Sequence, residues 1–210
     1  TSEAMANYMT LLGWSVPEGI NERFKISDIS GIFSFKKVNK ASAKFDWDKL
    51  NWLNSQVIHE MAPKTLLENL DPFFLKNGWH LPSKEWGISL VELIGPSMVL
   101  INDGVDQAKP FFVEPELMID GKAQLEKKES KLILKFILRN LESLDNSFIN
   151  AEKALVLINQ ATKSCEVKKG LVMKSLRAAL FGTLNGPDLI KSWVLLSRLG
   201  KDRSRISCFI

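Results

Sequence analysis

Residues 171–200, LVMKSLRAALFGTLNGPDLIKSWVLLSRLG, predict the fold more directly than any other part of the chain. Apolar side chains recur at helical spacing over about Leu171–Phe181, which indicates one amphipathic helix. A second helix is expected to start after Gly186 and to end at Gly200, with Pro187 in its first position. Proline suits that position because its missing amide hydrogen would have no partner inside the helix. The stretch therefore predicts two helices joined by a short turn.

The sequence before residue 171 continues the helical pattern. Two longer helices are expected at about Ala123–Leu141 and Ser147–Ala161, where apolar residues again repeat at helical spacing. Prolines and glycines are frequent between 63 and 114, so shorter helices with tight connections are expected there. The chain is therefore predicted to be mainly α-helical.

The N-terminal part predicts helices together with a short strand. An amphipathic helix is expected at Ser2–Gly13, and Ser27 is expected to cap a short helical turn. Alternation of apolar and polar residues favours a strand at 33–38, and the loop 40–44 is expected to be solvated. Asp46 is then expected to begin a helix by accepting a hydrogen bond from a backbone amide two or three residues later.

Length and composition narrow the class of protein. Of the 210 residues, 45% are hydrophobic and 25% are charged, which is typical of folded soluble domains and excludes wholesale disorder. No apolar run approaches the roughly 18 residues that span a bilayer, so no membrane association is expected. Cys165 and Cys208 lie far apart without a CxxC pair, which favours a reducing cytoplasm over a disulfide framework. Because the first residue is Thr1 and no export signal follows, we interpret the sequence as a piece of a longer cytoplasmic protein.

Positive charge is concentrated near the C-terminus. The net charge of the whole chain is +4. Counted along the sequence, it is 0 for residues 1–62, −3 for 63–114, 0 for 115–162 and +7 for 163–205, where ten basic residues accompany three acidic ones. A phosphate backbone requires such a concentration, although a solvated helix face also explains it.

The sequence contains no complete active site. His59 and His80 are the only histidines, and neither lies in a metal-binding or catalytic spacing. Nucleophile-elbow, dinucleotide-binding and P-loop motifs are all absent. No catalytic residue and no metal site are therefore expected in this chain, and recognition is the function that remains.

The turn between the last two predicted helices is the strongest candidate for recognition. Backbone amides at a helix start, with the positive end of the helix dipole, suit phosphates or acceptor atoms on base edges. Arg177 lies near the end of the preceding helix, and nearby positive charge is expected from Lys174, Lys191, Arg198, Lys201, Arg203 and Arg205. An ordinary connection between helices explains Gly186 and Pro187 equally well, so both interpretations stay open.

Three passages resemble motifs of one enzyme family, the bacterial glutamyl-tRNA synthetases. They are NYMTLLGW at 7–14, SAKFDWDKLNWLN at 42–54, and LRAALFG at 176–182 with GPDL at 186–189 and LLSRLGKDR at 195–203. The passages occur in the order of the family's motifs and span nearly the whole chain.

The resemblance implies that the chain is the C-terminal, tRNA-binding part of such a class I synthetase. Family members carry a nucleotide-binding fold with HIGH-like and KMSKS-like signatures, which we expect upstream of Thr1. The whole enzyme would attach glutamate to tRNA with ATP and Mg²⁺, whereas this piece is expected to hold no cofactor and to be inactive alone. Residues 1–62 would be a partial stem-contact region, and 63–114 and 115–210 would be two all-helical anticodon-binding domains.

The family's anticodon pocket is matched by Arg177, Gly186, Pro187 and Leu189, which would hold splayed bases of the anticodon loop. Many members that accept only the glutamate tRNA carry arginines in an R-P-R-F-like run, where this chain has Gly95 and Ser97. Glycine and serine cannot make the two directed hydrogen bonds of a guanidinium to one base. We therefore expect relaxed discrimination between the glutamate and glutamine tRNAs, unless the local alignment slips or another side chain substitutes.

The expected partner is thus tRNA, with no DNA and no second copy of the chain. Two other classes of function stay open. A helical scaffold for another protein would bind with little salt dependence, whereas RNA affinity falls steeply with salt. A standalone RNA-modifying enzyme related to synthetases would need a catalytic fold that this sequence lacks.

Overall fold

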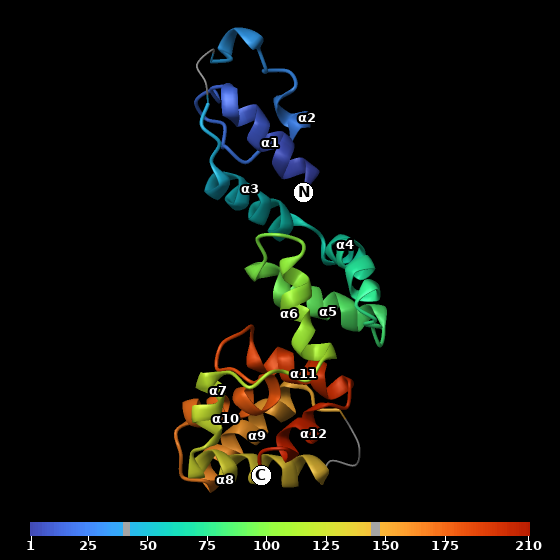
Figure 1. The fold of residues 1–210 in the computed structure, drawn as a ribbon, viewed down its shortest axis with the longest axis vertical. Coiled ribbons are helices and arrows are strands. Elements are labelled where there is room, and N and C mark those ends of the chain that lie inside the picture. Colours follow the sequence, from blue (N-terminus) through green and yellow to red (C-terminus); the bar gives the residue numbers. More distant parts are fainter. Residues whose placement is uncertain (40–42, 144–147) are drawn as a thin grey trace. The chain divides into compact units, whose positions relative to one another are not determined.

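A computed structural model describes residues 1–39, 43–143 and 148–210 (Figure 1). Helices account for 67% of the chain and strand for 1%, which confirms the predicted mainly α-helical class. The predicted loop at 40–44 and the predicted helix start at Ser147 lie partly or wholly outside the described residues.

The helices form two compact units. Unit 1 comprises Thr1–His80 and Ile94–Gln107, and unit 2 comprises Leu81–Leu93 and Ala108–Ile210. Unit 1 contains four helices and two 3₁₀ turns among its described residues: α1 (Ser2–Gly13), α2 (Ile26–Ile29), η1 (Phe35–Lys37), α3 (Trp47–Glu60), α4 (Pro63–Lys76) and η2 (Gly95–Ser97). Two further helices, α5 (Lys84–Ile94) and α6 (Asp103–Phe112), contribute residues to both units.

Helix α1 packs on α3 and forms the N-terminal core of unit 1. Asp46 caps α3 by accepting a hydrogen bond from the amide of Lys49 (3.0 Å), as predicted. Ala4 and Tyr8 of α1 are buried against Leu50 and Leu53 of α3. The helical spacing of these apolar residues thus places both helices on a common core.

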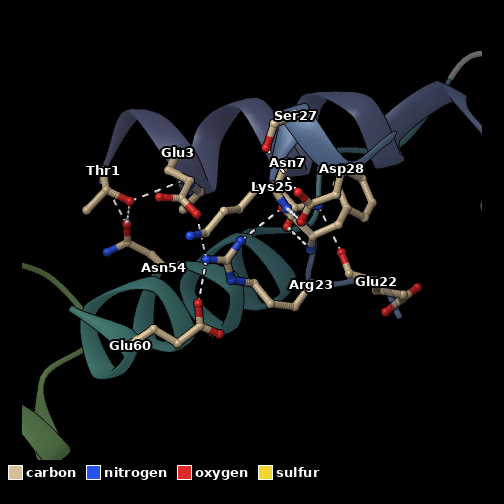
Figure 2. A network of polar contacts seen from close by, with 12 residues as sticks. Thr1, Glu3, Asn7, Glu22, Arg23, Lys25, Ser27, Asp28, Asn54 and Glu60 are labelled. Carbon is tan, nitrogen blue, oxygen red and sulfur yellow. Dashed lines mark hydrogen bonds and ion pairs between the residues drawn. The ribbon is translucent and has the colours of Figure 1, made fainter. Parts of the chain in front are cut away.

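A partly buried arginine joins α1 to α3 on their polar side (Figure 2). The Nη2 atom of Arg23 lies 2.6 Å from a carboxylate oxygen of Glu3 and 2.7 Å from one of Glu60. Asn7 of α1 holds the neighbouring loop, because its side chain donates to the carbonyl of Glu22 (2.9 Å) and accepts from the amide of Phe24 (3.1 Å).

Two local predictions for the N-terminal part are wrong. Ser27 lies inside α2 rather than before it, because Lys25 is the N-cap. The amide of Asp28 donates to the carbonyl of Lys25, and the amide of Lys25 donates to the side chain of Asp28. The expected strand at 33–38 is instead the 3₁₀ turn η1, since the Ser34 hydroxyl accepts from the amide of Lys36 and bends the chain. Among the described residues, the only strand-like pairing is an isolated antiparallel bridge between Trp14 and Val38.

Unit 2 is built around α10 (Lys169–Phe181), which contacts α7 (Ile119–Leu125), α8 (Lys128–Glu142), α9 (Ala151–Ser164) and α12 (Asp202–Ser207) (Figure 1). Helix α11 (Leu189–Arg198) packs on α9. The side chains of Val172, Leu176 and Leu180 on α10 are fully buried. The helix predicted at about Leu171–Phe181 is therefore the central helix of this unit.

Two helix boundaries in unit 2 differ from the prediction. The single helix expected at 123–141 is divided into α7 and α8, because the Ser130 hydroxyl donates to the carbonyl of Gln124 (2.6 Å) and ends α7 there. The Gln124 side chain also reaches Ser175 of α10 (3.1 Å), so the corner is fixed to the core. A further helix, α12, follows Gly200, where the sequence predicted the last helix to end.

Candidate nucleic-acid interface

The connection between α10 and α11 is fixed in place by α7. Helix α10 ends at Gly182, which has a left-handed conformation (φ 74°). A side-chain oxygen of Asp120 accepts from the amide of Leu184 (3.1 Å), and this bond lowers the pKa of Asp120. A Cβ added at Gly121 would overlap the carbonyl oxygen of Gly182, and one added at Gly182 would overlap that of Glu116. The two backbone segments therefore touch directly at these glycines.

Arg177 of α10 binds the backbone of the connection between α10 and α11. Its Nη2 donates to the carbonyl of Pro187 (2.8 Å), and burial lowers the pKa of its half-buried guanidinium while the charge of Asp188 opposes this change. Gly186 has a φ of 137°, and a Cβ there would lie 3.1 Å from Nη1 of Arg177. Within the described residues Nε and Nη1 of Arg177 have no hydrogen-bond partner. The structure thus brings Arg177, Gly186 and Pro187 together in one corner, as the sequence predicted for these three.

The start of α11 differs from the prediction. Asp188 is the N-cap, so Leu189 and not Pro187 takes the first helical position, and the Asp188 carboxylate accepts from the amide of Lys191 (2.8 Å). Pro187 therefore precedes the helix, and an acidic side chain already occupies one of the amides that were expected to be open. Leu189 is 2% exposed, so its side chain belongs to the core and only its backbone borders the corner.

The predicted basic residues fall into two groups. Lys174, Lys191 and Arg198 are exposed. The other three bind carbonyl groups of the chain: Lys201 that of Phe112 (2.6 Å), Arg203 that of Leu141 (2.9 Å), and Arg205 those of Pro110, Val113 and Leu180 (2.8–2.9 Å). A count of charges along the sequence does not separate the two groups.

Arg205 is the clearest revision of the predicted interface. It is 2% exposed, and its Nε lies 3.1 Å from a carboxylate oxygen of Glu114. Burial lowers the pKa of its guanidinium, and Glu114 opposes this change. With its donors directed at the chain itself, Arg205 ties α12 to the ends of α6 and α10 and has no surface to offer a phosphate.

The sequence did not predict a groove between α5 and α11. Its volume is about 230 Å³, and it is lined by Ser89, Glu92, Leu93, Ala151, Lys191, Val194, Leu195 and Arg198. The buried indole of Trp86 donates to the carbonyl of Leu195 (3.0 Å), which fixes the two helices against each other. The spacing of Lys191 and Arg198, two helical turns apart, was the available signal, but only the fold shows that α5 faces them.

Gly95 and Ser97 lie in the turn η2 of unit 1, whereas Arg177 and its neighbours lie in unit 2. Gly95 is buried, and a Cβ there would lie 3.1 Å from Cδ2 of Leu66. Ser97 is exposed, with its hydroxyl oxygen 2.8 Å from the carbonyl of Ile94 and 2.6 Å from the side chain of Gln107. Neither residue places a positive charge at this turn.

The part of the chain that the structure describes shows neither a metal-binding cluster nor a membrane-spanning helix. No group of three or more His, Cys, Asp or Glu side chains there could hold a metal ion. No helix among these residues is long and apolar enough to cross a membrane.

Most of the chain matches a known protein family. A family model described as the anticodon binding domain matches residues 65–210. The chain belongs to the anticodon-binding-domain family. Within that family's matched range lie all of the predicted anticodon residues, from Gly95 to Leu189.

Individual relatives confirm the resemblance to glutamyl-tRNA synthetases. A glutamate-tRNA ligase of Prochlorococcus marinus strain NATL2A is 81% identical over 210 residues, which is 100% of this chain and 44% of that protein. The ligase of Synechococcus sp. strain CC9311 is 54% identical over 206 residues, or 98% of this chain and 43% of that protein. The chain thus spans less than half the length of these relatives.

Solved structures agree with the sequence comparison. The crystal structure of a glutamate tRNA ligase from Elizabethkingia meningosepticum, in complex with its amino acid, has a TM-score of 0.87 and 25% sequence identity. The alignment covers 98% of this chain and 40% of that one. The anticodon-binding-domain fold therefore extends over the residues that carry the corner and the groove.

Proposed function

We propose that this chain is the tRNA-binding part of a glutamate-tRNA ligase and that it holds the anticodon loop. Its family, the identity of its relatives and the net charge of +7 over residues 163–205 support this proposal. The positive charge attracts the phosphate backbone without regard to sequence, so base recognition needs a more specific element.

The corner of Arg177 supplies that element and is the observation that carries the proposal. Its guanidinium is held on the carbonyl of Pro187, and its unpaired Nη1 lies beside Gly186, which has no side chain. A planar donor fixed in one orientation, with donor groups left unpaired, suits the acceptor atoms of an unstacked base. Single-stranded loops are recognised by proteins in this manner, because their bases can be splayed out.

Each part of the longer protein would have its own role in aminoacylation. Residues 1–62 would contact the inner corner of the tRNA, and 63–114 and 115–210 would grip the anticodon loop. The remainder of the protein would activate glutamate with ATP and Mg²⁺ and esterify the tRNA in the cytoplasm. This chain, as a monomer, contributes position and specificity, and by itself it forms no glutamyl-adenylate.

The test is binding of glutamate tRNA transcripts to the Arg177→Lys variant, measured by fluorescence anisotropy. Lysine keeps the charge but loses the fork, so we expect about a tenfold or greater loss of affinity, with less penalty for an altered anticodon base. Arg139→Lys, an exposed change on α8, is the matched control and should bind as the original chain does. Unchanged affinity and unchanged anticodon preference in Arg177→Lys would refute the proposed pocket.

A second part of the proposal concerns the turn η2. Since Gly95 and Ser97 present no guanidinium, we propose that the chain discriminates weakly between the glutamate and glutamine tRNAs. A tenfold or larger preference for the glutamate tRNA, about 1.4 kcal/mol, contradicts this proposal. Ser97→Arg is the informative variant and should increase the preference, because residue 97 is exposed. Gly95→Arg would instead push its Cβ against Leu66.

A further inference from the structure

The groove between α5 and α11 has the properties of a built site rather than an incidental hollow. The bond from Trp86 to the carbonyl of Leu195 fixes its two walls, and both of these residues are buried. Val194 and Leu195 form part of an apolar lining between the charged groups. The charged side chains therefore line a groove of about 230 Å³ whose walls are held in fixed positions.

One wall of the groove offers only donors. Lys191 and Arg198 both lie on α11 seven residues apart, so they share one face and are separated by about 10 Å along the helix axis. Both are exposed, and within the described residues neither charged group has an ion-pair or hydrogen-bond partner. These two groups are consequently available to anionic oxygens of a ligand.

The opposite wall offers only acceptors. Glu92 is exposed, and among the described residues its carboxylate forms no ion pair with Lys191 or Arg198. The Ser89 hydroxyl donates its proton to the carbonyl of Glu85 (3.0 Å), so its oxygen can only accept from a ligand. A simple anion fits this wall poorly, because the Glu92 carboxylate would repel it.

We propose that the groove binds one ribose-phosphate unit of an RNA strand, with Glu92 accepting a hydrogen bond from the ribose 2′-hydroxyl. Lys191 and Arg198 hold the phosphates that flank this ribose. The 2′-hydroxyl is a donor close to a phosphate, and it is the group that distinguishes RNA from DNA. The groove would thereby make binding depend on the sugar, independently of the bases that the Arg177 corner contacts. This inference rests on the proposed function, since it presumes an RNA partner.

The experiment uses the whole chain and a synthetic anticodon stem-loop of the glutamate tRNA, with 2′-deoxy substitutions introduced one nucleotide at a time. For the original chain we expect one position at which the substitution lowers affinity about tenfold, as for a hydrogen bond to a charged group. In Glu92→Ala the same substitution should have no effect. Glu129→Ala removes an exposed carboxylate of α8 outside the groove and should retain the full effect.

The cationic wall provides the second measurement. Lys191→Ala and Arg198→Ala should weaken all stem-loops alike and should each reduce the slope of log K against log salt by about one. Lys131→Ala, an exposed change on α8, is the control. Binding that is unaffected by these two groove variants would overturn the proposal and favour a protein partner for the groove.

Failure of the groove and failure of tRNA binding would give different results. If the stem-loop binds in a salt-dependent manner but no 2′-deoxy position depends on Glu92, the groove proposal is wrong and tRNA binding stands. If no RNA binds at all, both fail. Loss of the 2′-hydroxyl effect in Glu92→Ala alone supports the groove as the site that senses ribose.

Discussion

The side-chain amide of Asn54 donates a hydrogen bond to the carbonyl of Val99 (2.5 Å), which ties α3 to the segment that follows η2. Asn54 is 5% exposed, and its Oδ1 also accepts from the hydroxyl of Thr1 (2.9 Å). His59, one turn further along α3, lies with its Nε2 3.1 Å from the carbonyl of Met98. The end of the SAKFDWDKLNWLN motif thus positions the turn that carries Ser97.

Replacing Asn54 with alanine should destabilise this attachment. The Val99 carbonyl would lose its donor, and the net contribution of such a partly buried hydrogen bond is about 0.5–1.5 kcal/mol of unfolding free energy. Urea unfolding of Asn54→Ala measures the cost, with Asn51→Ala on the same helix as the control. A change no larger than that of the control would show that the bond contributes nothing to stability.

Gly186→Ala should damage the corner of Arg177. The φ of 137° is strained for alanine, and the new Cβ would crowd Nη1 of Arg177. We expect a loss of about 1–3 kcal/mol in unfolding free energy, together with weaker tRNA binding. Gly170→Ala is the opposite case, because this helical glycine has nothing near its Cβ position, and the change should stabilise by up to about 1 kcal/mol. Equal effects of the two substitutions would contradict the strain argument.

Arg205→Lys should cost stability rather than RNA affinity. Lysine cannot reproduce the bonds of the guanidinium to three carbonyls and Glu114, so we expect a loss of about 3 kcal/mol or more. The affinity of the folded variant for tRNA should not change, because the buried guanidinium contacts no ligand. Arg198→Lys, on the exposed surface, should alter the unfolding free energy by about 0.5 kcal/mol or less. A loss of stability no larger than that of Arg198→Lys would contradict the structural role of Arg205.

Asp120 should make the α10–α11 connection sensitive to acid. The bond from the Leu184 amide lowers the pKa of its carboxyl in the folded state. The stabilisation is therefore present above the unfolded pKa of about 4 and is lost as pH falls through the lower folded pKa. In Asp120→Asn the acid-dependent part should be absent, so the difference in unfolding free energy from the original chain should shrink below about pH 4. A difference that is constant across this range would exclude the carboxylate as its origin.

Local rules predicted those features that nearby residues determine. Asp46 caps α3 as expected, because the carboxylate and the amide of Lys49 are three residues apart. The break between α7 and α8 was missed because it depends on Ser130 and Ser175 meeting Gln124, and Ser175 is distant in sequence. Tertiary contacts of this kind leave no periodic signal.

The candidate site was predictable to the same extent. Arg177, Gly186 and Pro187 were expected together because a single turn joins their helices. The roles of Asp188 and Arg205 were not, since an acidic cap competes with an open helix start and a cation can bind carbonyls instead of solvent. The acceptor wall at Glu92 required knowledge that α5 packs beside α11.

The contact between Gly121 and Gly182 has a consequence for how this protein can vary. The carbonyl of Gly182 fills the space that a methyl group on Gly121 would need, and the carbonyl of Glu116 fills the space that one on Gly182 would need. The position of the loop ahead of Pro187, the partner of Arg177, therefore depends on two methyl groups that are absent. A single methyl on α7 would displace the loop while leaving every charged group intact. Damage to RNA recognition can thus originate in a helix that carries none of the recognition residues, and no change of charge would reveal it.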